Sequence, residues 1–317
     1  RSSKNCCHGR VMVARRPSRC RLPQTPEIAT FREDLDYVNH RHPKGVKFSG
    51  PLEDARRRDF TINALFYDPK TSRILDTTDG LADLRAHVIR AVGDPLVRFK
   101  EDALRLLRAV RFAARLDFVI EPATTAAILE RAKLIATVSS ERVRDELSMM
   151  WMGPRPAQAL EMLSRFGLLE TILPELEALK LTAPGSWAKT LKSLHSLTMQ
   201  SPEPSSTLAW ATLLLEVGKT PGQAPGHVAR EIATRFKMSR EEIERVGRLV
   251  EDHDRFREAF KMRESTLERF LREPDFDELL ALHKIAAIVT DGNLAFYEFC
   301  QSRHAAMHAT LTSDVPK

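Results

Sequence analysis

The fold is decided by the stretch Arg98-Phe-Lys-Glu-Asp-Ala-Leu-Arg-Leu-Leu-Arg-Ala-Val-Arg-Phe-Ala-Ala-Arg-Leu116. Its apolar residues recur at helical spacing, which predicts one amphipathic helix over residues 98–116 with one buried side. The opposite side carries arginines three or four residues apart: Arg105, Arg108, Arg111 and Arg115. A solvated face with i,i+4 ion pairs is the ordinary explanation for such charges, and each pair contributes only about 0.2–0.5 kcal/mol.

Asp102 and Arg105 stand at positions i and i+3 of this predicted helix, so their side chains can lie next to each other. A carboxylate acceptor beside a guanidinium donor matches a base edge with an exocyclic amine next to an unprotonated ring nitrogen. Cytosine and adenine have this edge, whereas guanine and uracil would reverse both contacts. The pair therefore predicts a preference for C and A over G and U.

A second charged cluster lies upstream, where residues 53–65 read Glu-Asp-Ala-Arg-Arg-Arg-Asp-Phe-Thr-Ile-Asn-Ala-Leu. Three consecutive arginines that end in Asp59 and run into an apolar segment are difficult to explain by folding alone. Guanidinium groups suit phosphate oxygens, and a fixed aspartate can hold a ribose hydroxyl. This cluster weakens the ordinary explanation for the arginines of residues 98–116.

These two segments resemble the class II tRNA nucleotidyltransferases and the bacterial poly(A) polymerases. The resemblance rests on Arg57-Arg58-Asp59-Phe60-Thr61-Ile62-Asn63-Ala64, on Glu101-Asp102-x-x-Arg105, and on Asp79-Gly80-Leu-x-Asp83-Leu84 and Gly93-Asp94-Pro95-x-x-Arg98-Phe99 between them. Further segments in the family's order are Glu27–Arg32, Tyr37–Pro43 and Glu141–Glu146. The resemblance runs from residue 27 to residue 180 and more weakly beyond, and it does not separate the family's two activities.

The resemblance implies an α+β fold, with a partial nucleotidyltransferase head (a truncated small sheet plus helices) followed by an all-helical body. We expect four parts: an atypical basic leader over residues 1–26, disordered or mistranslated; the partial head over 27–94; a helical neck that binds nucleotide and RNA over 95–180; and a helical C-terminal domain over 181–317. The C-terminal domain resembles an HD-type domain in His195, Leu213–Lys219, His227 and His253. The resemblance is degenerate, because Leu215-Glu216 stand where a His-Asp pair is expected. We therefore expect no metal there.

The sequence also predicts individual elements. Strands are expected at 26–32, 46–48, 74–76 and 88–92, with a polar loop over 36–45. Helices are expected at 122–132, 140–152 and 156–166, with a break near residues 180–186. For the apolar run 61–67, the pattern fits either a strand or a buried helix, and the resemblance favours a helix.

The implied function is template-independent addition of nucleotides to RNA 3′ ends, most specifically CCA addition to tRNA from CTP and ATP. By resemblance, Asp102 and Arg105 would pair with the incoming base, and Arg108 and Arg111 would bind the triphosphate. The nucleotide-binding set also includes Arg57, Arg58, Asp59 and Asn63: the first three would position ribose and phosphate, while Asn63 is more often a structural hydrogen-bonding residue. The expected partners are tRNA or another RNA 3′ end, with CTP and ATP.

The family's Gly-Gly-x-x-Arg-Asp and Asp-x-Asp segments are not found in this sequence, and no Asp or Glu precedes Glu27. Mg²⁺ is expected for the family, and two-metal transfer needs carboxylates that hold both ions. We therefore expect no catalytic carboxylate pair and no metal ligands in this sequence. Two alternatives to CCA addition stay open, and the missing carboxylates support the second. One is a poly(A) polymerase of the same family, and the other is a non-catalytic remnant that binds nucleotide or RNA.

Charge and composition add little to these predictions. The net charge of +6 comes from residues 1–26, which hold seven Arg or Lys and no acid, so it is not evidence for RNA binding. No apolar run is long enough to span a bilayer, and nothing indicates secretion, so we expect a cytoplasmic protein without membrane contact. The oligomeric state does not follow from the sequence.

Overall fold

The computed structural model describes residues 50–217 and 226–307 in full, and only the backbone of residues 308–313 and of strands 11–14, 27–30, 32–38 and 42–48. The chain divides into two compact units, Arg1–Leu134 and Ile135–Lys317. Apart from strand Val11–Ala14, the leader expected at residues 1–26 lies outside the described residues. The division into four parts stays a prediction.

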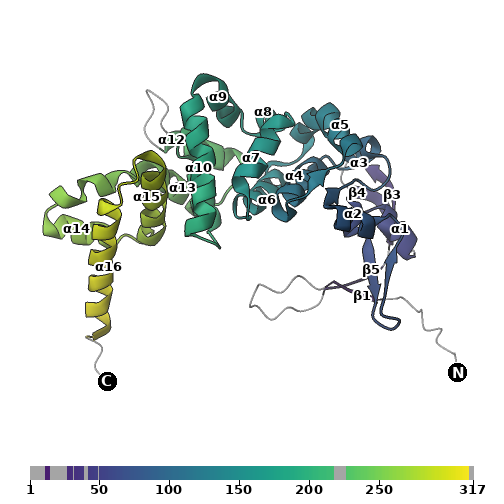
Figure 1. The fold of residues 1–317 in the computed structure, drawn as a ribbon, viewed down its shortest axis with the longest axis horizontal. Coiled ribbons are helices and arrows are strands. Elements are labelled where there is room, and N and C mark those ends of the chain that lie inside the picture. The colour runs from purple at the N-terminus through teal and green to yellow at the C-terminus, as the bar shows by residue number, and fades with distance from the viewer. Residues whose placement is uncertain are drawn as a thin grey trace. The chain divides into compact units, whose positions relative to one another are not determined.

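The first unit combines short strands with helices (Figure 1). In chain order its elements are β1 (Val11–Ala14), β2 (Glu27–Thr30), β3 (Arg32–Val38), β4 (His42–Phe48), α1 (Pro51–Arg56), η1 (Thr61–Asn63), β5 (Leu65–Asp68), β6 (Arg73–Asp76), α2 (Gly80–Ala86), β7 (Val88–Ile89), α3 (Pro95–Glu101), α4 (Leu104–Leu116), β8 (Val119–Ile120) and α5 (Pro122–Arg131). The 3₁₀ segment η2 (Ala132–Thr137) crosses the boundary between the units.

The described strands pair two by two. β1–β2, β3–β4 and β5–β6 are antiparallel, and β7–β8 is parallel with Val88 opposite Val119. The strands expected at 26–32, 46–48 and 74–76 are present, but β3 and β4 extend through most of the expected loop at 36–45, so that prediction is wrong. β7 is shorter than the expected strand at 88–92, because the Ala91 backbone forms only an isolated bridge with Phe60.

The stretch 98–116 forms two helices, so the prediction of one continuous helix is wrong. α3 ends at Glu101 and α4 begins at Leu104. At Asp102 the backbone is extended, with φ −146° and ψ 102°, and its Oδ1 accepts a hydrogen bond from the Leu104 N–H at 3.1 Å. An aspartate that bonds backbone N–H groups competes with helix continuation, which explains the break.

The apolar run 61–67 is likewise not one helix. It begins as the 3₁₀ turn η1 and continues as strand β5, so the prediction of a helix, which the resemblance favoured, is wrong for most of the run.

Gly80, at the start of α2, explains how closely α2 packs against η1. A Cβ at Gly80 would come within 2.3 Å of the Thr61 carbonyl oxygen. Only glycine therefore allows α2 and η1 to approach this closely.

The second unit is helical in its described part. Its elements are α6 (Ser140–Trp151), α7 (Pro156–Arg165), α8 (Leu169–Ile172), α9 (Pro174–Thr182), α10 (Pro184–Gln200), α11 (Ser206–Leu214), α12 (His227–Arg235), α13 (Arg240–Asp252), η4 (Arg255–Lys261), α14 (Glu264–Leu271), α15 (Phe276–Thr290) and α16 (Ala295–Ser313). The helices predicted at 122–132, 140–152 and 156–166 correspond to α5, α6 and α7. The expected break near 180–186 falls between α9 and α10.

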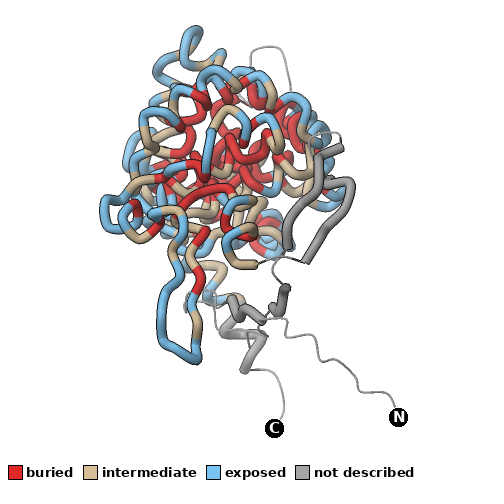
Figure 2. The backbone as a smooth tube through the Cα atoms, turned by 90° about the vertical axis from the view of Figure 1, so that its right-hand side faces the viewer, coloured by how far each residue is buried: buried red, intermediate tan, exposed pale blue. Residues whose placement is uncertain are grey.

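Buried aromatic rings contribute to the interior of the second unit. Figure 2 shows buried residues along the inner parts of the backbone and exposed residues along its outside. Trp151 and Trp210 pack edge to face with ring centroids 6.3 Å apart, and Phe236 lies 5.3 Å from Trp210. Such pairs combine large apolar burial with favourable ring geometry.

The observed fold is an α+β head followed by a helical body, and the HD-like character of that body stays a prediction. In the described part, no helix has the length and apolarity that a membrane crossing requires.

Candidate functional site

Six arginines of the first unit make up the arginine cluster: Arg57, Arg58, Arg98, Arg105, Arg108 and Arg111. They come from two segments, 57–58 after α1 and 98–111 on α3 and α4. These segments are far apart in sequence, yet direct hydrogen bonds join them. The structure therefore brings together the two charged stretches that the sequence singled out.

Asp54 of α1 holds the first two arginines of the cluster. Its Oδ1 accepts from Arg57 Nε and Nη2 at 2.9 and 2.6 Å, and its Oδ2 accepts from Arg58 Nε and Nη2, both at 3.1 Å. Arg58 Nη1 also donates to the Asn63 carbonyl at 3.0 Å, and its guanidinium lies 4.9 Å from the Phe66 ring centroid. Asp54 is only 2% exposed, so both arginines are anchored on a buried carboxylate.

Arg98 and Arg105 connect α3 and α4 to the Arg57–Arg58 backbone. Arg98 Nη2 donates to the Arg58 carbonyl at 2.8 Å, and Arg105 Nη2 donates to the Arg57 carbonyl at 3.1 Å. Both guanidinium groups also donate to Glu101 Oε2. Arg98 and Arg105 are buried, and their contacts hold the Arg57–Arg58 backbone in place.

Asp59 and Arg108 form an ion pair between a buried carboxylate and a partly exposed guanidinium. Asp59 Oδ2 accepts from Arg108 Nε at 2.7 Å, while its Oδ1 accepts from the Phe60 N–H at 2.9 Å and from Asn63 Nδ2 at 3.0 Å. Burial alone would raise the pKa of Asp59, but Arg108 and these hydrogen bonds hold it below its ordinary value. Asp59 is therefore a carboxylate at neutral pH.

The last arginine of the cluster, Arg111, lies against the same aromatic ring as Arg108. Its guanidinium carbon lies 4.3 Å from the Phe112 ring centroid, and that of Arg108 lies 5.4 Å from the same ring. Phe112 packs edge to face on the buried Phe60, with centroids 5.8 Å apart. Stacking on an aromatic face stabilises a guanidinium and fixes its plane.

Asp102 and Arg105 are arranged differently from the expected side-by-side pair on one helix. Asp102 lies in the break between α3 and α4, and Arg105 lies in the first turn of α4. The Arg105 N–H donates to the Asp102 carbonyl at 3.1 Å, whereas the Arg105 guanidinium donates to Glu101 and to the carbonyls of Arg57 and Arg98. Base recognition by this pair stays a prediction.

The charge balance of the site suits an anionic ligand. Residues 53–59 and 98–111 together contain eight Arg or Lys and five Asp or Glu. The Arg57, Arg58 and Arg108 side chains keep exposed fractions of 25%, 29% and 32%, so a ligand can reach them from solvent. Phosphate oxygens are the acceptors that guanidinium groups bind best.

The acids of this site do not fit a metal ion. Asp54, Asp59 and Glu101 all accept hydrogen bonds from arginines. Over residues 50–217 and 226–307, no three His, Cys, Asp or Glu side chains gather as a possible ligand group.

Sequence reasoning missed Asp54, Arg98 and Glu101 as members of this site. A signal for them exists in the spacing. Asp54 stands three and four residues before Arg57 and Arg58, and Glu101 stands three residues after Arg98 and four before Arg105. Opposite charges at these separations meet on one face of a helix. That signal predicts ion pairs, but it does not predict that their carboxylates are buried.

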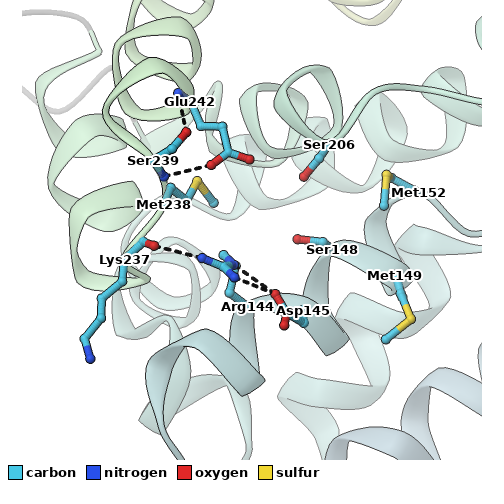
Figure 3. A pocket seen from close by; sticks show the side chains of 10 residues that line it. All are labelled: Arg144, Asp145, Ser148, Met149, Met152, Ser206, Lys237, Met238, Ser239 and Glu242. Carbon is cyan, nitrogen blue, oxygen red and sulfur yellow. Dashed lines mark hydrogen bonds and ion pairs between the residues drawn. The ribbon is translucent and has the colours of Figure 1, made fainter.

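A hollow of about 580 Å³ lies in the second unit (Figure 3). Its floor and walls come from α6, from the start of α11 and from the turn between α12 and α13. The lining residues are Arg144, Asp145, Ser148, Met149, Met152, Ser206, Lys237, Met238, Ser239 and Glu242. Arg144 donates to Asp145 Oδ1 and to the Lys237 carbonyl, so the guanidinium is fixed in the wall.

The residues that suggested an HD-type domain are spread over the second unit. His195 is on α10, His227 begins α12, and His253 directly follows α13. Leu215 and Glu216 follow α11 and are buried. His253 Nδ1 donates to the Val250 carbonyl at 2.8 Å, which is an ordinary structural contact.

Comparison with known protein families finds two matches. The model of the poly(A) polymerase head domain matches residues 8–90. The model described as "Probable RNA and SrmB-binding site of polymerase A" matches residues 117–180. The head-domain match begins within the segment expected as a leader. The second match includes α6 and thus half of the residues that line the hollow of the second unit.

Individual relatives agree with these matches. The CCA-adding enzyme of Lactobacillus helveticus is 36% identical over 231 residues, which are 72% of this chain and 54% of that enzyme. The CCA-adding enzyme of Streptococcus gordonii is 39% identical over 226 residues, 71% of this chain and 52% of that enzyme. The chain thus spans about half the length of these two curated relatives.

A solved structure extends the similarity to most of the chain. The crystal structure of the Bacillus stearothermophilus CCA-adding enzyme in complex with CTP superposes with a TM-score of 0.67 at 26% identity. It covers 90% of this chain, which corresponds to 65% of that enzyme. With its head domain and RNA-binding domain, the chain belongs to the class II family of CCA-adding enzymes and poly(A) polymerases.

Proposed function

We propose that this protein acts in the template-independent addition of nucleotides to RNA 3′ ends, and specifically in CCA addition to tRNA from CTP and ATP. Its curated relatives at 36% and 39% identity are named CCA-adding enzymes, which supports CCA addition over poly(A) addition. The proposal includes tRNA, CTP and ATP as partners and the cytoplasm as the compartment.

The observation that carries the proposal is the arginine cluster. Two distant segments converge on one surface, where three guanidinium groups remain partly exposed over buried carboxylates. In this proposal Arg57, Arg58 and Asp59 position ribose and phosphate, with Asn63 holding Asp59. Arg108 and Arg111 bind the triphosphate.

Asp102 and Arg105 read the base in this proposal. One bidentate contact discriminates between bases by about 1–3 kcal/mol, and a partner left unpaired against the wrong base adds to that difference. The Arg105 guanidinium also supports the Arg57 and Arg98 carbonyls. Base reading therefore requires part of this hydrogen-bond set to rearrange when a nucleotide binds.

The first test is the Asp102→Ala variant. We expect CTP and ATP to bind about ten-fold more weakly and selection against UTP and GTP to decrease. Equilibrium binding of all four nucleotides to the full chain measures both effects. Asp94→Ala is the matched control, since Asp94 accepts the Leu96 N–H at the start of α3 as Asp102 accepts the Leu104 N–H. Unchanged discrimination in Asp102→Ala would remove the base-reading assignment.

The second test separates the candidate activities. The purified chain is incubated with Mg²⁺, CTP, ATP and a tRNA transcript that ends before CCA, and product length is measured. Addition of three nucleotides supports CCA addition, and a long A tract indicates poly(A) addition. Nucleotide binding without incorporation indicates a chain that binds but does not catalyse. Failure to bind any nucleotide contradicts the proposal.

A further inference from the structure

We propose that Asp54 is a positioning residue, whose buried carboxylate sets the direction of the Arg57 and Arg58 guanidinium groups so that they meet the phosphate of a bound nucleotide. This inference rests on the proposed function, because it deepens the roles given there to the two arginines. It concerns a residue that would not itself touch the nucleotide.

The geometry places one acid beneath two cations. The Asp54 side chain is 2% exposed, whereas the Arg57 and Arg58 side chains are 25% and 29% exposed. Each guanidinium presents its Nε and Nη2 edge to a different oxygen of the same carboxylate. Paired contacts of this kind fix both the position and the plane of a guanidinium.

The backbone that carries the two arginines is fixed as well. Arg98 and Arg105 donate to the carbonyls of Arg58 and Arg57, so the main chain at these residues is held from the side of α3 and α4. With the backbone held in this way, Asp54 directs the Arg57 and Arg58 side chains through two hydrogen bonds to each guanidinium, and the Asn63 carbonyl and the Phe66 ring hold Arg58 in addition. The carboxylate therefore has a role that Arg98 and Arg105 do not duplicate.

A buried carboxylate is costly unless it is paired, and hydrogen bonds to charged groups are stronger than neutral ones. Asp54→Asn keeps the size of the side chain but leaves one acceptor oxygen and introduces an N–H donor. That donor would face a guanidinium, which has no acceptor. The variant can therefore hold one arginine but not both.

The experiment measures CTP binding and arginine order in the full chain. For Asp54→Asn we expect the Kd for CTP to rise about ten-fold. Without nucleotide, the NMR signal of at least one of the Arg57 and Arg58 Nε–H groups should lose the downfield shift and slow exchange of a carboxylate-bound guanidinium. Asp54→Glu keeps the charge and should recover most of the binding.

Asp83→Asn is the matched control. Asp83 is also buried and also pairs with an arginine, since its carboxylate accepts from Arg90 Nε at 3.2 and 3.0 Å. It makes none of the described contacts of the arginine cluster. We expect Asp83→Asn to lower the Tm while the Kd for CTP stays within about two-fold of the wild-type value.

Two outcomes would contradict the role of Asp54, and a third would contradict the proposed function. Unchanged Nε–H signals and an unchanged Kd in Asp54→Asn would overturn the role of Asp54. An equal rise of the Kd in Asp54→Asn and Asp83→Asn would also overturn it, because general loosening would then explain both. If the wild-type chain binds no CTP, the proposed function fails, and the Nε–H signals alone decide whether Asp54 fixes the two arginines.

Discussion

The two units of this protein differ in how many charged side chains they bury. In the described part of the first unit, six charged side chains are buried: Asp54, Asp59, Asp83, Arg98, Arg105 and Arg111. In the larger described part of the second unit, Glu146 and Glu216 are the buried carboxylates, and every buried arginine of the described chain lies in the first unit. Aromatic and aliphatic side chains fill both interiors, but the first unit buries several charged side chains among them.

This difference indicates where the molecule retains interactions for reasons other than stability. Burying an ion pair costs desolvation that its attraction often fails to recover, and apolar replacement is often neutral or stabilising. An interior built from arginines and carboxylates is therefore weak evidence for stability. We interpret it as a device that fixes guanidinium groups in place, and the predictions below test this contrast.

The largest effect is expected from Trp210→Ala in the second unit. Trp210 is fully buried between Trp151 and Phe236, and its indole N–H donates to Ser148 Oγ at 2.8 Å. Removing it should lower the free energy of unfolding of this unit by about 3–5 kcal/mol. Denaturant unfolding measures this loss. CTP binding by the folded protein should be unchanged, and a large loss of binding would contradict the separation of roles.

A smaller loss is expected from Arg98→Met in the first unit. Methionine has an apolar side chain of similar length, but the substitution removes the donors to the Arg58 carbonyl and to Glu101. We expect the free energy of unfolding to decrease by about 2–3 kcal/mol. Arg257→Met is the control, because Arg257 pairs with Asp254 and Asp291 at an exposed position. Equal losses in the two variants would contradict the importance of burial.

The pH dependence should also differ between the units. Burial is the main cause that lowers the pKa of His283, and a hydrogen bond from its Nδ1 to the His253 carbonyl, 2.8 Å long, opposes it. The unfolded state then binds the proton more tightly, so the stability that this residue contributes is complete above pH 6.5 and decreases as the pH falls below it. Replacing His283 by Phe should flatten the Tm profile between pH 6.5 and 5.

For Asp59 in the first unit the same linkage acts at lower pH. Its lowered pKa means that its contribution is complete above the ordinary value of 3.8 and is lost as the pH falls below it. Asp59→Asn should therefore change the acid limb of the Tm profile and leave its shape near pH 6 unaltered. A changed shape near pH 6 would contradict the assignment of the two windows.

The smallest effect is expected from Lys237→Gly at the end of α12. Lys237 has φ +51°, and the Met238 N–H bonds the Ala233 carbonyl at 3.1 Å, as in a Schellman motif. Glycine adopts this conformation without strain, so the variant should gain about 0.5–1 kcal/mol. The contact of Lys237 Nζ with Glu141, which the variant loses, is exposed and contributes little to stability. Thermal unfolding measures the gain, and a loss would mean that the lysine side chain matters here.

Local pattern was enough for much of the fold and for part of the site. Apolar periodicity predicted α5, α6 and α7 within one residue at each end. Arginine spacing and the resemblance selected the residues of the cluster, and the motifs predicted the family that the comparisons show. These features depend on neighbours three or four residues apart, which a sequence displays directly.

The tertiary structure decided the rest. The helix breaks at Asp102 because its carboxylate accepts a hydrogen bond from the Leu104 N–H, which competes with helix continuation. The apolar run 61–67 forms a turn and a strand because β6 pairs with its second part. The pairing of Asp59 with Arg108 joins residues 49 positions apart. The sequence by itself determined which charges are present and on which local faces. Only packing decided which of them are buried together, because burial and long-range contacts are properties of the whole fold.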